Sequence, residues 1–316
     1  MKRSAIFGGV AWAALAAAAG LRLEHLTTIE LLFLLAPLVV VPLGLELIVR
    51  VVPEPEFLPL GRAVRTLQLP AALCVAVSFW ISPGRAAVLL VLPWFGVGCL
   101  TGLMAVREFL RGGFKRLDSA SMIMSFLYLP VGCAWLVASR LGMMPMAFQE
   151  PIVLLTAVHF HFAGFAAPLL ALAVHSKLKM ENTAARSFYN VIAAGVLAGP
   201  GLLAAGFVIG PRTKLVMALI VACSESGLAL YFLGAIRNLR PRLAQTFVAI
   251  SAASVLMAMF LAAAWAIGEF PLQPFVHLDQ MARYHGTMNG LGFILCGLVG
   301  WTLANGSAIA SERGEQ

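Results

Sequence analysis

Long apolar runs separated by short polar connections dominate the chain. Each run approaches the roughly 20 residues that a helix needs to cross the hydrocarbon core of a bilayer. The runs are continuous and lack the alternation of apolar and polar positions that is typical of lipid-facing strands. Because every backbone donor in hydrocarbon must be paired within the protein, the pattern predicts helices. We expect ten spans, near residues 4–20, 29–49, 66–82, 86–106, 119–139, 151–174, 188–210, 214–235, 243–267 and 284–304.

The composition excludes a water-soluble enzyme. Apolar residues make up 61% of the 316 residues and charged residues 11%, against roughly 45–50% and 25% in soluble domains. The longest polar connections lie at 53–65, 107–118, 175–186 and 268–283, and none is long enough for a separate soluble domain. We therefore expect one all-α domain over residues 1–316, a polytopic transmembrane helix bundle whose main partner is the lipid bilayer.

Basic residues are distributed unevenly between alternate connections. The N-terminus, the even-numbered loops and the C-terminal tail hold 16 of the 22 Lys and Arg residues, and the odd-numbered loops hold 6. By the positive-inside rule, we expect both termini on the cytoplasmic side of the membrane, which we expect to be a bacterial inner membrane. The net charge of +8 is thus a topology signal. Since the basic residues form no dense run, we expect no nucleic-acid partner.

The first apolar run has a second interpretation. Lys2 and Arg3 precede an Ala-rich apolar stretch, a pattern that is also typical of a cleaved signal peptide. Cleavage would remove one helix. The later connections would still alternate between those rich in Lys and Arg and those poor in them.

Several polar side chains fall inside the predicted spans. A charged side chain in hydrocarbon costs at least about 2.5–3.5 kcal/mol on insertion scales, so each needs a partner, a cavity or a function. A rise of about 1.5 Å per residue places five of them in the outer half of the membrane, on three helices. These candidate site residues are His159 and His161 in the sixth span, Glu225 in the eighth, and His285 with Asn289 in the tenth. Glu46 stands apart, since Arg50 follows one turn later as a ready salt-bridge partner.

The spacing of the histidines limits how they can act together. His285 and Asn289 are four residues apart and share a helix face, where Gly286 and Gly290 allow a helix or ligand to approach closely. His159 and His161 point about 200° apart around a regular helix, so we expect one to serve the site and the other to hydrogen-bond elsewhere.

Further features surround these residues. The segments His161-x-x-Gly164-Phe165 and Asn289-x-x-Gly292-Phe293 echo each other on two helices. Gly199-Pro200-Gly201 predicts a break or kink in the seventh helix. The connection at 269–279, rich in aromatic residues and proline, is expected to form either a compact outer cap with His277 and Asp279 near the cavity mouth or a plain connecting loop.

Two segments of the chain carry a family resemblance. They are Thr156-Ala157-Val158-His159-Phe160-His161-Phe162-Ala163-Gly164-Phe165 and His285-Gly286-Thr287-Met288-Asn289-Gly290-Leu291-Gly292-Phe293. Over them the chain resembles the YndJ-like family of bacterial membrane proteins, commonly labelled as candidate transporters. The resemblance implies that the histidines and Asn289 matter without assigning their roles. A weaker likeness to haem–copper oxidases rests on the His-x-His pattern, but His285 is the only further histidine expected within the membrane.

Two functions of different classes fit this pattern, and purely structural pairing of the polar groups between helices is the alternative to both. In the first, the protein is a transporter or small-solute binding protein, and the five candidate residues form a substrate-binding or proton-coupling site. In the second, His159, His161 and His285 hold a metal or haem in an enzyme that acts on a lipid or small redox substrate. The opposed directions of His159 and His161 favour the first. The sequence does not identify a cofactor or a substrate.

Overall fold

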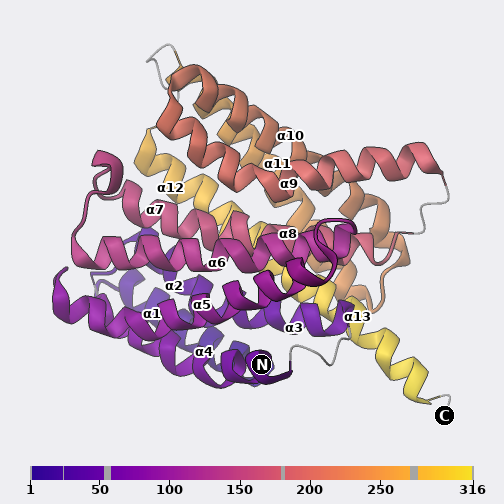
Figure 1. Ribbon diagram of the computed structural model, residues 1–316, viewed down its shortest axis with the longest axis horizontal. Helices are drawn as coiled ribbons and strands as arrows, with labels where there is room; N and C mark the ends of the chain where they lie inside the picture. Colours follow the sequence, from indigo (N-terminus) through magenta and orange to yellow (C-terminus); the bar gives the residue numbers. More distant parts are fainter. Residues whose placement is uncertain (1, 24, 53–57, 179–181, 271–276, 315–316) are drawn as a thin grey trace.

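The computed structural model describes residues 2–23, 25–52, 58–178, 182–270 and 277–314, and these residues form helices and connections without a β-strand. Ten helices in the described chain are long and apolar enough to cross a membrane. They pack side by side as a bundle (Figure 1). The predicted all-α bundle of about ten spans is thereby confirmed.

Seven of the ten spans are regular α-helices. These are α1 (Lys2–Gly20), α4 (Leu58–Ser78), α5 (Arg85–Gly112), α6 (Leu117–Leu141), α9 (Thr183–Ile209), α10 (Pro211–Ala235) and α11 (Arg242–Glu269). Two short 3₁₀ turns, η3 (Pro145–Ala147) and η5 (Ile236–Asn238), lie in the connections after α6 and α10.

The other three spans each contain a π-helical stretch between two α-helices. The second span is α2 (Thr28–Leu35), η1 (Ala36–Val40) and α3 (Val41–Val51). The sixth is α7 (Ile152–His159), η4 (Phe160–Ala166) and α8 (Ala167–His175), and the tenth is α12 (Leu278–Thr287), η6 (Met288–Leu295) and α13 (Cys296–Gly314).

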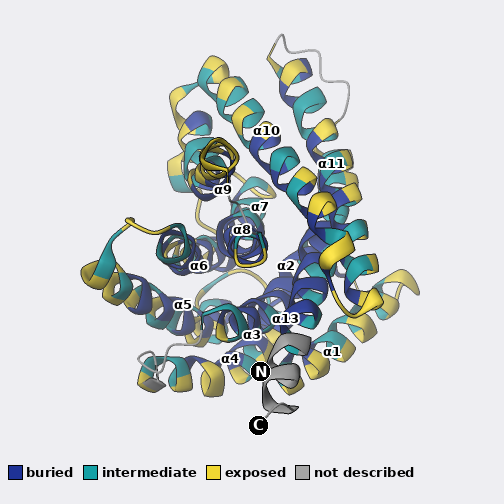
Figure 2. Cartoon of the chain, turned by 90° about the vertical axis from the view of Figure 1, so that its right-hand side faces the viewer, coloured by how far each residue is buried: buried dark blue, intermediate teal, exposed yellow. Residues whose placement is uncertain are grey.

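These three composite spans form much of the interior. In the most apolar stretch of the second span 78% of the residues are buried, and in that of the sixth 67%, against 11% in α1. Figure 2 shows α8 and α2 in the middle of the bundle, with α1 on its rim. A span surrounded by other helices is apolar on all sides, which explains the uninterrupted apolar sequence at 31–45.

Several predicted boundaries differ from the structure, and the starts of two spans show why. The third span begins at Leu58 rather than near residue 66, and the tenth begins at Leu278 rather than near residue 284. The length of an apolar run matches the thickness of the hydrocarbon core. The helix itself is longer, because it continues into the polar interface at either side.

Of the break or kink predicted at Gly199-Pro200-Gly201, the break is wrong, since α9 runs without interruption from Thr183 to Ile209. The Tyr128 hydroxyl of α6 donates to the carbonyl of Leu197 at 3.1 Å and accepts from the N–H of Gly201 at 3.3 Å. One side chain thus pairs backbone groups on both sides of Pro200 and holds the helix together.

Buried side chains of neighbouring helices also donate to backbone carbonyls of the π-helical stretches. In the second span, the Val41 N–H bonds to the Ala36 carbonyl, and the next residue, Pro42, has no N–H to donate. The buried Gln68 side chain of α4 donates to the Pro37 carbonyl instead, at 2.6 Å. In the tenth span the Ser251 hydroxyl of α11 donates to the Phe293 carbonyl at 2.7 Å. Side chains of neighbouring helices therefore supply hydrogen-bond donors to the carbonyl groups of irregular backbone inside the bundle.

Candidate functional site

A cavity of about 750 Å³ opens among the sixth to tenth spans. Its walls are mainly apolar, with contributions from α7, η4, α9, α10, α11, α12 and η6. At one end it reaches Phe148, Val208 and His277, which border the connections predicted to lie outside the cell. The cavity therefore occupies the half of the bundle in which the sequence placed its polar residues.

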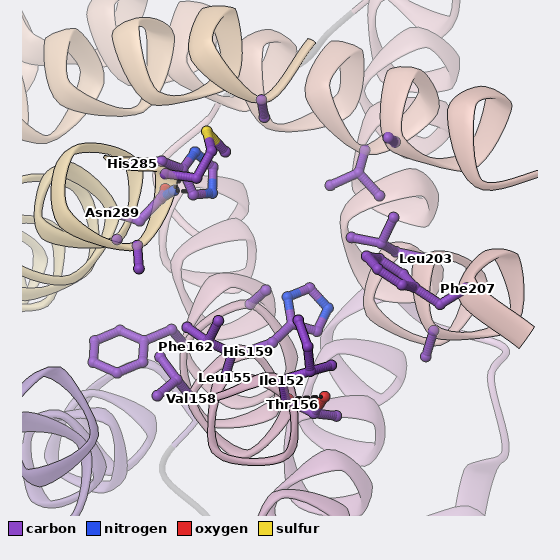
Figure 3. Close-up of a pocket in the computed structure, with 18 of the residues that line it drawn as sticks. Ile152, Leu155, Thr156, Val158, His159, Phe162, Leu203, Phe207, His285 and Asn289 are labelled. Atoms are coloured by element: carbon purple, nitrogen blue, oxygen red, sulfur yellow. Dashed lines mark hydrogen bonds between the residues drawn. The ribbon is translucent and has the colours of Figure 1, made fainter. Parts of the chain in front are cut away.

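Four of the five candidate residues line this cavity. They are His159 at the end of α7, Glu225 in α10, His285 in α12 and Asn289 in η6. Figure 3 shows His159 on one helix, His285 with Asn289 on a second, and Leu203 with Phe207 on a third, arranged around the cavity. Side chains far apart in the sequence thus meet at one place.

His285 and Asn289 form a fixed hydrogen-bonded pair. The Nδ1 atom of His285 lies 2.9 Å from the Ala258 carbonyl of α11, and its Nε2 atom lies 2.9 Å from the Asn289 Nδ2. A carbonyl accepts and an amide nitrogen donates, so a neutral imidazole with its proton on Nδ1 satisfies both contacts. Both ring nitrogens of His285 are therefore engaged. The amide oxygen of Asn289 is the acceptor that this pair can offer to a ligand.

His159 has unused hydrogen-bonding capacity. Its Nε2 atom is buried and has no hydrogen-bond partner among the described residues, while the backbone of Pro200 approaches the ring. His159 is the last residue of α7, directly before the π-helical η4. A histidine with one free ring nitrogen can donate or accept according to its tautomer.

Glu225 is the most deeply buried carboxyl group of the cavity wall. The residue is 4% exposed, and its Oε2 atom has no hydrogen-bond partner in the described part of the chain. Its neighbour Ser224 packs so closely against α9 that a Cβ at Gly195 would overlap the serine hydroxyl. This close approach of α9 and α10 fixes the position of Glu225 on the wall.

His161 does not reach the cavity, and in this respect the five-residue site needs correction. The side chain is fully buried, its Nδ1 lies 2.8 Å from the Ala157 carbonyl, and its Nε2 accepts a hydrogen bond from the Trp94 indole at 3.1 Å. Two residues of separation turn it to the opposite side of the helix from His159, towards α5. The structure therefore gives His161 a structural role.

The three-histidine metal site has no geometric support. Within the described residues no group of three or more His, Cys, Asp or Glu side chains is placed to hold a metal ion. With His161 bonded to Trp94, His159 and His285 are the two remaining histidines of that set, and a catalytic zinc ordinarily has three protein ligands.

Sequence reasoning missed an ion pair at the outer end of the cavity. Lys214 of α10 lies 2.8 Å from Oε1 of Glu269 at the end of α11, and its ammonium lies over the rings of Phe207 and Trp265. Glu269 lines the cavity, and its second oxygen has no hydrogen-bond partner among the described residues. Both charges sit at helix ends, where they resemble ordinary interface residues. The sequence contained one local regularity at this place. Lys214 and Glu225 are eleven residues apart and therefore share one face of α10.

The outer connection is only partly described. Residues 271–276 of the expected cap lie outside the described residues, whereas His277 lines the cavity and Asp279 is exposed. At the other end of the bundle, Arg50 pairs with Glu46 at 2.8 Å, the arrangement expected from their spacing.

Gly286 and Gly290 admit a neighbouring helix. A Cβ on either residue would come within 3.1 Å or less of the Leu32 side chain of α2. The two glycines therefore let α2 pack directly against the helix that carries His285 and Asn289.

Comparison with known proteins agrees with the membrane architecture. The model of the family described as YndJ-like protein matches residues 31–293. The chain is also 25% identical over 213 residues to a Bacillus subtilis (strain 168) protein described as "Uncharacterized membrane protein YndJ". The match covers 66% of this chain and 37% of that relative, so this chain spans well under half of its length. No solved structure matches.

Proposed function

The chain belongs to the YndJ-like family of membrane proteins. We propose that it is a bacterial inner-membrane transporter or binding protein for a small, largely apolar solute. The solute occupies the cavity between the sixth and tenth spans, and its polar group contacts His159, Glu225 and Asn289. A mostly apolar pocket with a few converging polar groups is the usual form of a small-molecule site.

One observation carries the proposal: three buried polar atoms on this cavity wall, His159 Nε2, Glu225 Oε2 and Glu269 Oε2, have no protein partner among the described residues. Buried polar groups left unpaired cost about 1–3 kcal/mol each. Of the seven such atoms in the described chain, three gather on the wall of this one cavity, and the other four lie elsewhere. Unpaired groups gathered beside an open volume favour a site that is completed by a ligand.

The first test fills the cavity and measures binding of an apolar fluorescent probe, Nile red, to purified protein in nanodiscs. Ala262 lines the cavity, and Ala253 lies on the same helix with its side chain exposed. We expect Ala262→Trp to lower saturable probe binding at least tenfold, because an indole takes up much of the space. Ala253→Trp should bind the probe as the wild type does.

The two variants carry the same chemical change on one helix, so partition of the probe into lipid affects both equally. Equal saturable binding by Ala262→Trp, Ala253→Trp and the wild type would refute a ligand site in this cavity.

A further inference from the structure

The charges around the cavity are predominantly acidic. Glu225 and Glu269 line it, and among the described lining residues there is no lysine or arginine. Lys214 lies nearby, but it is already paired with Glu269 and covered by two aromatic rings. An anionic ligand would therefore meet the uncompensated carboxyl group of Glu225, whereas a cationic ligand would complement it.

Glu225 is the group best placed to bind a cation. It is 4% exposed, and its Oε2 lacks a partner within the described structure. Hydrogen bonds between an ionised donor and a carboxylate are roughly twice as strong as neutral ones. An ammonium group would supply both the missing donors and the missing charge, which an alcohol or a ketone could not.

The shape of the cavity indicates what is attached to that group. Lys214 and Glu225 lie about 16 Å apart along one face of α10, at a rise of 1.5 Å per residue. Ala218 and Val221 lie between them on this face and line the cavity. Leu203 of α9 lies on a further wall (Figure 3). An apolar wall of this length, with a carboxyl group at its inner end, suits an elongated molecule with one polar end.

We propose that the ligand is a lipophilic amine, whose ammonium group binds Glu225 and whose apolar body lies along α10 towards the Lys214–Glu269 pair. This inference rests on the proposed function and names the chemical class of the solute. His159, with its free Nε2, provides a second contact for the polar end. Phe207 and Trp265 provide aromatic surface at the far end.

A series of three probes with the same tail tests the class of ligand. Decylamine, decanol and decanoate are compared at neutral pH by the midpoint of thermal unfolding of the protein in nanodiscs, titrated with each probe. We expect decylamine to bind about tenfold more tightly than decanol, as one charge-assisted contact would provide. Decanoate should bind most weakly.

Two variants assign the preference to Glu225. Glu225→Gln removes the charge at nearly constant shape, and we expect it to bind decanol as before and to lose the preference for decylamine. Glu46→Gln makes the same change in a membrane-embedded carboxylate that lies outside the cavity and is paired with Arg50. This control should keep the full preference for the amine.

The outcomes separate the two proposals. Equal binding of the three probes, or tightest binding of decanoate, would overturn the amine while leaving a ligand cavity intact. An amine preference that survives Glu225→Gln would overturn the role of that residue. If no probe shifts the midpoint and Nile red binding is also unaffected by Ala262→Trp, both proposals fail. The probe series on the wild type remains decisive even if Glu225→Gln does not fold.

Discussion

His159 and His161 show how two identical side chains, two residues apart, acquire different tasks. His161 has both ring nitrogens paired inside the protein, and His159 has an unpaired nitrogen beside the cavity. In the interior of a bundle, a fully paired imidazole stabilises the fold, whereas a half-paired one is available to a ligand.

This difference predicts opposite effects of one substitution. His161→Phe leaves the buried Trp94 N–H without an acceptor, and we expect it to lower stability by about 1–3 kcal/mol with no change in Nile red affinity. His159→Phe removes the hydrogen bond of the ring with the Pro200 backbone but none of the Nε2 atom, so we expect a smaller loss of stability than in His161→Phe, while decylamine binding weakens. Unfolding midpoints in detergent and probe titrations measure the two effects. A loss of probe binding in His161→Phe with normal stability would contradict the assignment.

The sequence predicted that these two histidines could not act together, because their angular separation is a local property of a helix. It could not predict which of them faces the cavity. That depends on Trp94, which lies in a different span and 67 residues away in the chain. For the same reason the Lys214–Glu269 pair was missed: its members are 55 residues apart in the sequence and meet only because α10 and α11 pack side by side.

Among the elements, α1 shows how one glycine can determine where a peripheral helix packs. A Cβ at Gly8 would lie 1.9 Å from the Leu38 carbonyl oxygen, so α1 and η1 are in direct backbone contact there. The Trp12 indole reinforces this contact by donating to the Leu31 carbonyl at 2.7 Å. Since backbone cannot move aside as a flexible side chain can, the contact requires glycine.

We therefore expect Gly8→Leu to displace α1 from the bundle and lower the unfolding midpoint by several degrees. Gly9→Leu is the matched control, because a Cβ at Gly9 meets nothing within 4 Å. Hydrogen exchange of residues 31–40 should increase in Gly8→Leu and not in Gly9→Leu. Equal effects of the two substitutions would argue against this contact.

The ten spans were predictable because hydrocarbon thickness sets the length of each apolar run. The positions of the π-helical stretches could not be predicted in this way. Proline predicted irregular backbone at Pro200, where α9 is continuous, while η6 contains no proline at all. In both places a neighbouring helix donates to a backbone carbonyl, Tyr128 to Leu197 and Ser251 to Phe293, so such a donor supports continuous and π-helical backbone alike. The echoed segments that begin at His161 and Asn289 coincide with η4 and η6, which shows that the pattern marked backbone geometry as well as chemistry.

At the scale of the molecule, the distribution of basic residues predicts the orientation in the membrane. Reporter fusions after Gly113 and after Met146 test it, since these positions lie in successive connections. We expect green fluorescent protein to fluoresce after Gly113, in the cytoplasm, and alkaline phosphatase to be active after Met146, outside. The opposite pattern would invert the bundle and place the cavity in the cytoplasmic half.

The π-helical stretches also have a consequence for how insertions and deletions would act on this protein. A π-turn accommodates one residue more than an α-turn. Removing a single residue from η6 would restore an ordinary helix and rotate everything before it by about 100° relative to everything after it. His285 would then leave the cavity while α13 kept its place. We therefore expect a one-codon deletion in η6 to turn the face of α12 that carries His285 away from the cavity.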